Sequence, residues 1–293
     1  MAGGIDHLVL CVRNLEEARE RYRRFGFTLT PPARHPFGTG NSLVQLSQGS
    51  FLELLTVADP DAIAPMRPGF FSFGAYNRDF VKREEGCSML VFESADAEAD
   101  ASAYRAAGLG AFAPFHFERL AKLPDGGTAK VAFTLAFAVD PKLPKAVFFA
   151  CQHHAPELFW KPEYQRHANG ALGLEEVALV AADPADLAAV FQSLTGSRVP
   201  RAVTDGLGID TGRGMLRAMT PAAYRRRYAG ARPPSLSDGP RFAGGIIRVE
   251  DLAAVRRLLL GSGIEFDEAE GALVIPPDEA FGFALGFVQR SKC

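Results

Sequence analysis

The chain has 293 residues, of which 47% are hydrophobic and 23% charged, and this composition is typical of a globular protein. The 32 Lys and Arg residues nearly balance the 34 Asp and Glu residues, so the net charge of −2 provides no field of one sign for nucleic acid or an anionic membrane. The length is sufficient for two domains, each with its own core.

The N-terminal residues lack a basic stretch followed by an apolar run, so we expect no secretory signal. The longest apolar runs are far shorter than the roughly 20 residues that a membrane helix needs. The four cysteines, Cys11, Cys87, Cys151 and Cys293, show no CxxC spacing. This pattern is typical of free thiols in a reducing compartment, and we therefore expect a cytoplasmic protein.

The first 57 residues predict the order strand, helix and three further strands. Residues 4–12 form a short apolar run rich in β-branched side chains, which indicates a strand. Asn14 is a favourable N-cap, and Gly26 is positioned to end the following amphipathic helix. Residues 27–30, 42–47 and 51–57 then read as strands.

The same order recurs three more times, and such an internal repeat determines the fold. The second copy has a strand at 87–93, a helix at 95–107 and strands at 128–139 and 145–152; the third has a strand at 174–181 and a helix from Asp183 to Leu194; the fourth has a strand at 245–249, a helix from 252 to 260 and strands at 264–266, 272–275 and 283–288. The sequence therefore predicts an α+β fold of four βαβββ modules.

Three long segments interrupt the repeat. Residues 58–85 are rich in proline and phenylalanine, and an aromatic loop of this length is expected to act as a lid. Residues 220–241 separate the last two modules. The predicted organisation is an N-terminal domain at 1–154 (modules 4–57 and 86–154), a linker at 155–172, and a C-terminal domain at 173–293 (modules 173–220 and 243–289).

The opening GIDHLVLCVRNLEEARERYRRFGF, closed by SFLELL, resembles the first module of a glyoxalase-like domain of the vicinal-oxygen-chelate (VOC) superfamily. The segments HPFGTGN, FFACQHHAPELFW and RHANGALGLEEVAL strengthen the resemblance. It implies the glyoxalase/bleomycin-resistance/dihydroxybiphenyl-dioxygenase-like fold, in which modules pair into two half-barrels. The superfamily includes isomerases, lyases, dioxygenases, epimerases and metal-free binding proteins, so the fold does not specify the reaction.

The resemblance also implies a divalent metal held by residues of the first and last strands of a module. His7 and Glu53 match those positions. Strand alternation places both side chains on the face opposite the module's helix, independently of the resemblance. An imidazole and a carboxylate suit Zn, Fe, Mn, Ni or Co, although a metal-free protein remains an alternative. Glu53 is also the expected catalytic residue, because its carboxylate could move a proton.

The second module departs from the family pattern. Cys87 or Met89 stands where a second histidine is expected, and the last strand carries no glutamate. Gln152, His153 or the following His154 could supply a third ligand. The corresponding positions in the C-terminal half lie near Glu176 and Gly244, without a histidine at either, so we expect no metal site there.

Four further residues are candidates for contact with a substrate. His35 and Asn41 would shape the cavity mouth, and Phe73 would close over an apolar part of the ligand. Arg78, or the nearby Arg67, could bind a carboxylate through two hydrogen bonds.

The sequence thus favours a metal-dependent lyase, isomerase or dioxygenase that acts on a small organic molecule with adjacent oxygens. The alternative is a metal-free protein of the bleomycin-resistance type, which binds an aromatic compound without turnover. A partner-binding scaffold is a third hypothesis, and it would expose a large apolar patch. The expected partner is a small, partly apolar molecule, not nucleic acid or a membrane. Four modules can complete their cavities in one chain, and a homodimer would therefore form for other reasons.

Overall fold

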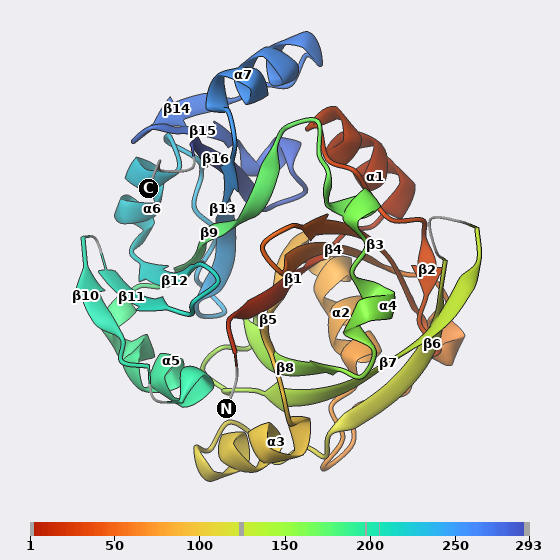
Figure 1. Ribbon diagram of the computed structural model, residues 1–293. Coiled ribbons are helices and arrows are strands. Elements are labelled where there is room, and N and C mark those ends of the chain that lie inside the picture. The colour runs from red at the N-terminus through yellow and green to blue at the C-terminus, as the bar shows by residue number, and fades with distance from the viewer. Residues whose placement is uncertain (1–2, 123–125, 197, 205, 290–293) are drawn as a thin grey trace.

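The computed structural model describes residues 3–122, 126–196, 198–204 and 206–289. Two curved eight-stranded sheets lie side by side, with helices on both their outer and their concave faces (Figure 1). The first sheet comprises β1 (Ile5–Cys11), β2 (Ala33–Arg34), β3 (Thr39–Leu46), β4 (Ser50–Val57), β5 (Gly86–Glu93), β6 (Phe115–Lys122), β7 (Thr128–Ala138) and β8 (Val147–His153). The second comprises β9 (Ala171–Val180), β10 (Arg201–Val203), β11 (Gly206–Asp210), β12 (Met215–Met219), β13 (Arg241–Val249), β14 (Asp267–Ala269), β15 (Ala272–Ile275) and β16 (Ala284–Gln289).

The helices connect and cover these strands. They are α1 (Leu15–Arg24), α2 (Phe73–Arg83), α3 (Ala97–Ala106), α4 (Pro156–Phe159), α5 (Ala188–Thr195), α6 (Pro221–Arg227) and α7 (Leu252–Gly261), with short 3-10 turns at η1 (Pro60–Ala62), η2 (Pro162–Gln165), η3 (Pro184–Leu187) and η4 (Pro277–Glu279). In the part of the chain that the structure describes, no helix is both long and apolar enough to cross a membrane.

The strand order confirms the four-module fold. The first sheet runs β2-β3-β4-β1-β5-β8-β7-β6, and the second runs β10-β11-β12-β9-β13-β16-β15-β14. In each sheet the first strands of two modules pair antiparallel at the centre, and each is parallel to the last strand of its own module. Each sheet is therefore a pair of modules that curves into a half-barrel.

Local sequence signals explain the module boundaries. The Asn14 side chain accepts hydrogen bonds from the backbone N–H groups of Glu16 and Glu17, as expected of an N-cap. Gly26 follows α1 with a φ of +88°, a left-handed conformation that favours glycine. The helix buries Ala18 and Tyr22 against the sheet.

Three expectations about local structure are wrong. Residues 27–30 and 264–266 are not strands; the short edge strands β2 and β14 follow them instead. The strand β6 was not expected. Segment 58–85 contains α2, which Ser72 caps, so the aromatic residues form a wall of the fold. Phe73 and Phe80 are buried in the core of the N-terminal half-barrel, and neither belongs to a loose lid.

The two half-barrels differ in what fills their concave faces. In the C-terminal half, α6 and the segment after it place Tyr224 and Tyr228 in a small apolar cluster on the second sheet, and both side chains are fully buried. Tyr228 packs so closely against Gly244 that a Cβ there would lie 2.6 Å from its ring. The N-terminal half keeps an open cavity.

Candidate functional site

A β-bulge at the start of β1 brings two adjacent side chains to one face. Ile5 pairs with Phe92 and His7 with Val91, so Asp6 is an extra residue in the strand. Its carboxylate Oδ2 lies 2.6 Å from His7 Nδ1 and 3.2 Å from His153 Nε2. The Asp6 side chain is 2% exposed. A buried carboxylate thus bridges two histidines.

The charges around Asp6 keep it ionised. Burial alone would raise the pKa of Asp6, but attraction to His153 and His7, with hydrogen bonds from both, outweighs burial and lowers that pKa below its usual range. An ionised carboxylate can only accept hydrogen bonds, so His7 donates from Nδ1. A neutral His7 therefore presents the lone pair of Nε2 to the cavity.

Glu53 lies opposite His7 in the cavity. Its Oε2 is 3.8 Å from His7 Nε2, and its Oε1 accepts a hydrogen bond of 2.6 Å from Asn41 Nδ2. Phe51 stacks on the His7 ring, with 4.2 Å between the ring centroids. His7 and Glu53 thus face each other as two hydrogen-bond acceptors, an arrangement that favours an electron-poor group between them.

His35 completes the polar wall beside Asn41. Its Nδ1 lies 2.8 Å from Thr39 Oγ1, and its Nε2 lies 3.3 Å from Asn41 Nδ2. Burial, together with the positive charge of Arg119 and the nearby His7, lowers the pKa of His35 to about 3. His35 is therefore neutral at physiological pH, and it orients Asn41.

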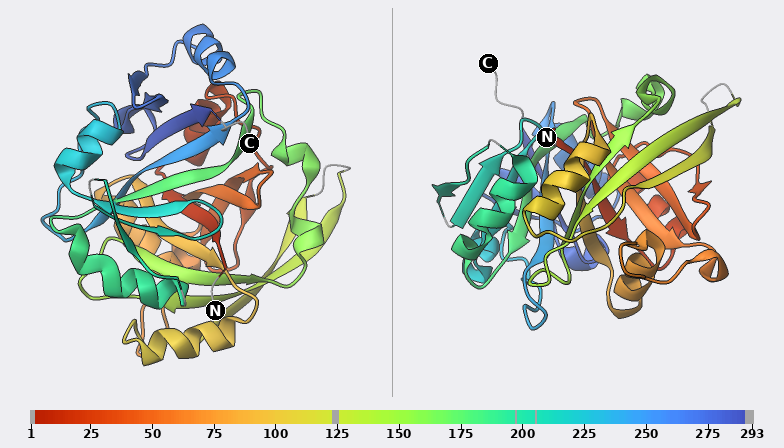
Figure 2. Two further views of the ribbon diagram at one scale, coloured as in Figure 1. Left: turned by 60° about the vertical axis from the view of Figure 1, so that its left-hand side comes forward. Right: turned by 90° about the horizontal axis from the view of Figure 1, so that it is seen from below.

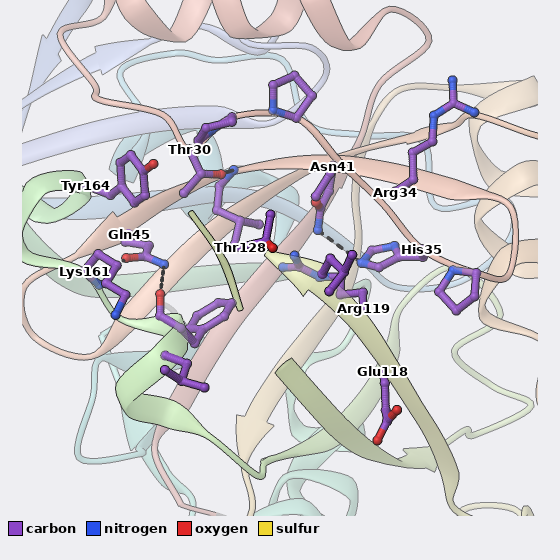
Figure 3. Close-up of a pocket in the computed structure, with 18 residues that line it drawn as sticks. Thr30, Arg34, His35, Asn41, Gln45, Glu118, Arg119, Thr128, Lys161 and Tyr164 are labelled. Atoms are coloured by element: carbon purple, nitrogen blue, oxygen red, sulfur yellow. Dashed lines mark hydrogen bonds between the residues drawn. The ribbon is translucent and has the colours of Figure 1, made fainter. Parts of the chain in front are cut away.

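These groups lie in a cavity with two connected chambers. The inner chamber, about 40 Å³, is lined by His7, Glu53 and His153 together with the rings of Phe51, Phe73, Phe117, Phe133, Phe149 and Phe159. The outer chamber, about 510 Å³, opens beside it and shares His35, Asn41 and Arg119 with it (Figure 3). A chamber of this size can hold a small organic molecule.

Six of the eight residues predicted for the site line the inner chamber: His7, His35, Asn41, Glu53, Phe73 and His153. Gln152 and Arg78 do not. Gln152 accepts a hydrogen bond from the backbone N–H of Ala97 and donates one to the carbonyl of Ala95, at the start of α3. Gln152 follows Cys151, whose side chain faces the cavity. Because side chains alternate along a strand, the side chain of Gln152 points to the face that the helix covers.

Arg78 lies outside the cavity. Its side chain is 31% exposed, and its Nε donates to Asp79 at 2.9 Å. The expectation that it binds a substrate carboxylate is therefore not supported by its position. The two alternative candidates, Arg67 and His154, are not among the residues that line the cavity. The guanidinium of Arg67 stacks over the ring of Phe70, and Nε2 of His154 lies 2.8 Å from Thr134 Oγ1. The arginine that lines the inner chamber is Arg119, and the sequence analysis predicted neither Arg119 nor Asp6 as a site residue.

A family model described as a glyoxalase-like domain matches residues 5–195. The chain belongs to this glyoxalase-like family, within the VOC superfamily. Among curated proteins, none matches the sequence. Solved structures show the same fold. A hypothetical protein from Staphylococcus aureus is 15% identical with a TM-score of 0.70, and the match covers 98% of this chain and 99% of that protein.

Two further solved structures resemble this glyoxalase-like protein in fold alone. A variant of 4-hydroxymandelate synthase from Streptomyces coelicolor is 14% identical with a TM-score of 0.53, and the match covers 100% of this chain and 94% of the other. A fusion protein of a xylose isomerase-like TIM barrel and 4-hydroxyphenylpyruvate dioxygenase is 12% identical with a TM-score of 0.51, with coverage of 100% and 49%.

The glyoxalase-like protein carries only half of the metal-ligand pattern that the family resemblance implies. Glu53 pairs with Val9 in the parallel register of β1 and β4, and in β5 and β8 the corresponding pair is Val91 and Phe149. By the same register, Met89 occupies the place of His7. Both second-module positions are thus apolar, and His7 and Glu53 alone do not complete a conventional site of three protein ligands.

One other group could hold a metal. In the described part of the chain, Asp6, Cys151 and His153 are the one set of three whose possible ligand atoms lie within 4.8 Å of one another. Asp6 is already hydrogen-bonded to two histidines. Burial, followed by the charges of Asp6 and Glu53, raises the pKa of the Cys151 thiol well above its usual value. The donor set is thus better suited to a hydrogen-bonded cluster than to a thiolate site.

Proposed function

We propose that the N-terminal half-barrel of this glyoxalase-like protein binds a small, largely apolar organic molecule, and that His7 acts on it as a general base. The observation that carries the proposal is the 2.6 Å contact between Asp6 Oδ2 and His7 Nδ1, which leaves His7 Nε2 directed at the cavity. A base oriented by a buried carboxylate is the arrangement that proton abstraction requires.

The surroundings of His7 favour such a step. When Nε2 takes a proton, the resulting imidazolium carries a positive charge next to the ionised Asp6, which stabilises it. Glu53, 3.8 Å away, is placed to exchange a proton or a hydrogen bond with the same part of the ligand. The phenylalanine rings around the inner chamber exclude water and so strengthen these interactions. Isomerase or lyase chemistry that begins with proton removal fits these features.

Solvent deuterium exchange tests the proposal without knowledge of the natural substrate. We would incubate the protein in D2O with a panel of 2-oxo acids, 2-hydroxy ketones and 1,2-diketones, and follow loss of the α-proton signal by NMR. Exchange above background should fall by about 10²–10⁴-fold in His7→Ala. His116→Ala is the matched control, because His116 is exposed and lies outside the cavity. Equal exchange in both variants would contradict the role of His7.

The second candidate is a metal-dependent enzyme, and the facing acceptors His7 Nε2 and Glu53 Oε2 favour it. These two residues would hold the ion, and a bound divalent metal would supply Lewis-acid chemistry. Elemental analysis of natively purified protein, before and after supplementation with Mn, Fe, Ni and Zn, separates the candidates. Near-stoichiometric metal lost in both His7→Ala and Glu53→Ala, but kept in His116→Ala, would establish the metal enzyme. Metal-free wild type would favour the proton-transfer proposal.

A binding protein without turnover is the remaining alternative. It would bind aromatic probes in the cavity while the exchange assay stays at background.

The cysteines bear on the location of the protein. Cys11, Cys87 and Cys151 are buried free thiols in the structure. Unpaired cysteines fit a reducing compartment, and this supports the proposal that the protein acts in the cytoplasm.

A further inference from the structure

Arg119 brings a positive charge into the cavity from β6. This strand and β7 form a long hairpin that projects beyond the rest of the N-terminal half (Figure 2). Arg119 lines both chambers, and its side chain lies next to His35 and Asn41 (Figure 3). Among the described residues that line the inner chamber, Arg119 is the one arginine or lysine, and it comes from a strand that borders the cavity mouth.

The guanidinium of Arg119 has unused hydrogen-bonding capacity. Its Nε is buried and has no hydrogen-bond partner. Burial lowers the pKa of Arg119, and the negative charge of Glu53 opposes that shift only in part. Its contact within the protein is the face of Phe133, whose ring centroid lies 5.8 Å from the guanidinium carbon. A buried donor without a partner costs free energy, and burial of a cation costs more. A ligand that supplies acceptors would offset that cost.

The outer chamber carries the same sign of charge. Arg34 and Lys161 line it together with Arg119. Among the described residues of its lining, Glu118 is the one that is acidic, and it forms an ion pair with Lys130. The whole chain has a net charge of −2, so this concentration of cations is local. It would attract an anionic ligand towards the mouth.

Aromatic rings of the inner chamber lie close to Arg119. Phe117 lies two residues from Arg119 on the same face of β6, and its ring centroid is 5.0 Å from that of Phe37 and 5.2 Å from that of Phe133. Rings at such spacing accommodate an aromatic group by edge-to-face contact. The cavity thus combines an apolar, aromatic wall with a guanidinium whose Nε lacks a hydrogen-bond partner.

We propose that Arg119 anchors the carboxylate of an aromatic carboxylic acid, whose ring packs among Phe37, Phe117 and Phe133. This inference rests on the proposed function because the ligand occupies the same cavity. Beyond that function, the inference names the chemical class of the ligand. The guanidinium fork matches a carboxylate through two parallel hydrogen bonds. The anchored acid then has its remaining atoms beside the inner chamber that His7 and Glu53 line.

Binding of matched acids and amides tests the anchor. The probes are ω-phenylalkanoates with one to four carbons between ring and carboxylate, each compared with its primary amide. Trp160 is the sole tryptophan, and its ring centroid lies 5.7 Å from that of Phe51, which lines the inner chamber. Its fluorescence therefore reports occupancy, and isothermal titration calorimetry gives the affinity.

The best acid should bind wild type about 10–100-fold more tightly than its amide, because a charge-assisted pair is lost in the amide. Arg119→Gln should abolish this preference, because it weakens binding of the acid much more than binding of the amide. Arg119→Lys should keep part of the preference, since it retains the charge without the fork. Arg225→Gln is the matched control, because Arg225 is exposed on α6 in the other half. Thermal melting confirms that each variant is folded.

The outcomes separate the two proposals. Equal binding of acid and amide to wild type, or a preference that survives in Arg119→Gln, would overturn the anchor while leaving ligand binding in the cavity intact. If no probe of either kind binds wild type, the anchor for aromatic acids is overturned together with the cavity proposal. A preference that depends on Arg119, combined with deuterium exchange indifferent to His7→Ala, would support the anchor and contradict the base.

Discussion

Asp6 and His7 are neighbours in the sequence, yet both side chains lie on the cavity face of β1, with 2.6 Å between Asp6 Oδ2 and His7 Nδ1. In a regular strand adjacent side chains point to opposite faces. The bulge between Ile5 and His7 removes that constraint and allows a carboxylate to orient a histidine one residue away. The placement of Asp6 beside His7 therefore depends on how β1 pairs with β5.

Replacement of Asp6 with asparagine tests this relationship. Asp6→Asn keeps the size of the side chain, but it removes the negative charge and replaces one acceptor oxygen with an amide group that donates hydrogen bonds. We expect the His7 ring to shift towards the tautomer protonated at Nε2, and any His7-dependent deuterium exchange to fall at least about tenfold. The loss of one satisfied buried contact should lower the free energy of unfolding by about 1–3 kcal/mol.

Long-range 15N NMR of the histidine rings measures the tautomer directly, and urea unfolding measures the stability. Asp96→Asn is a suitable control, because Asp96 caps α3 outside the cavity. An unchanged His7 tautomer in Asp6→Asn would mean that Asp6 does not orient the ring.

The sequence predicted the module order because each module repeats the same local signals. A capped amphipathic helix, a terminating glycine and alternating strands act within a few residues, so they can be read without the fold. His7 and Glu53 could be placed on one face by the same alternation. Asp6 could not, because its orientation arises from a bulge that forms only when β1 pairs with a strand about 80 residues later.

Arg119 was missed for a different reason. The segment from Phe115 alternates apolar and polar residues, and that period places Arg119 on the same face as Phe115 and Phe117. The alternation is short and ends at Arg119, so by itself it does not predict a strand there. Arg78, by contrast, was favoured because of its aromatic surroundings in the sequence, while the helical turn of α2 directs it to solvent.

The stability of the protein should depend on pH through His35. Burial is the main cause of its lowered pKa, which falls from 6.5 to about 3. Below pH 6.5 the unfolded chain binds a proton that the folded chain does not. The contribution of neutral His35 to the free energy of unfolding is therefore fully present above pH 6.5. It is lost as the pH falls, at about 1.4 kcal/mol per pH unit.

Between pH 7 and pH 5 the free energy of unfolding of wild type should therefore fall by about 2 kcal/mol more than that of His35→Gln. Urea denaturation at a series of pH values measures both. His116→Gln, at an exposed position, should keep the wild-type slope. Parallel curves for wild type and His35→Gln would show that His35 is charged in the folded protein.

The C-terminal half-barrel should depend on its tyrosines for packing. Tyr228 is fully buried, and its hydroxyl lies 3.4 Å from Glu176, which also meets Arg217 and Arg227. Tyr228→Ala should lower the free energy of unfolding by about 3–5 kcal/mol because it leaves a large cavity. Tyr228→Phe keeps the ring and loses one long hydrogen bond, so its cost should be about 1 kcal/mol or less.

Chemical denaturation of the two variants measures the difference. Binding of aromatic probes to the N-terminal cavity should be unchanged in Tyr228→Phe. Similar stability of Tyr228→Ala and wild type would indicate that the tyrosine does not fill this half-barrel, contrary to its burial.

The two half-barrels should not fold independently, because they share one hydrophobic core. Buried residues of both halves belong to the same cluster. Phe148 meets Phe242 with 5.3 Å between ring centroids, and Phe27 meets Phe287 at 6.0 Å. Glu84 also binds both Lys145 of its own half and Arg241 of the other. Removal of one half would expose these apolar surfaces to water.

Residues 1–172 expressed alone should therefore aggregate, or melt well below the full chain, even though they contain every residue of the cavity. Size-exclusion chromatography and circular dichroism measure both properties. Co-expression with residues 173–293 should restore a soluble 1:1 complex, because burial of the shared core drives the association. A monomeric, cooperatively folded 1–172 fragment would instead show that the core of the N-terminal half is sufficient, and that the C-terminal half contributes little to its stability.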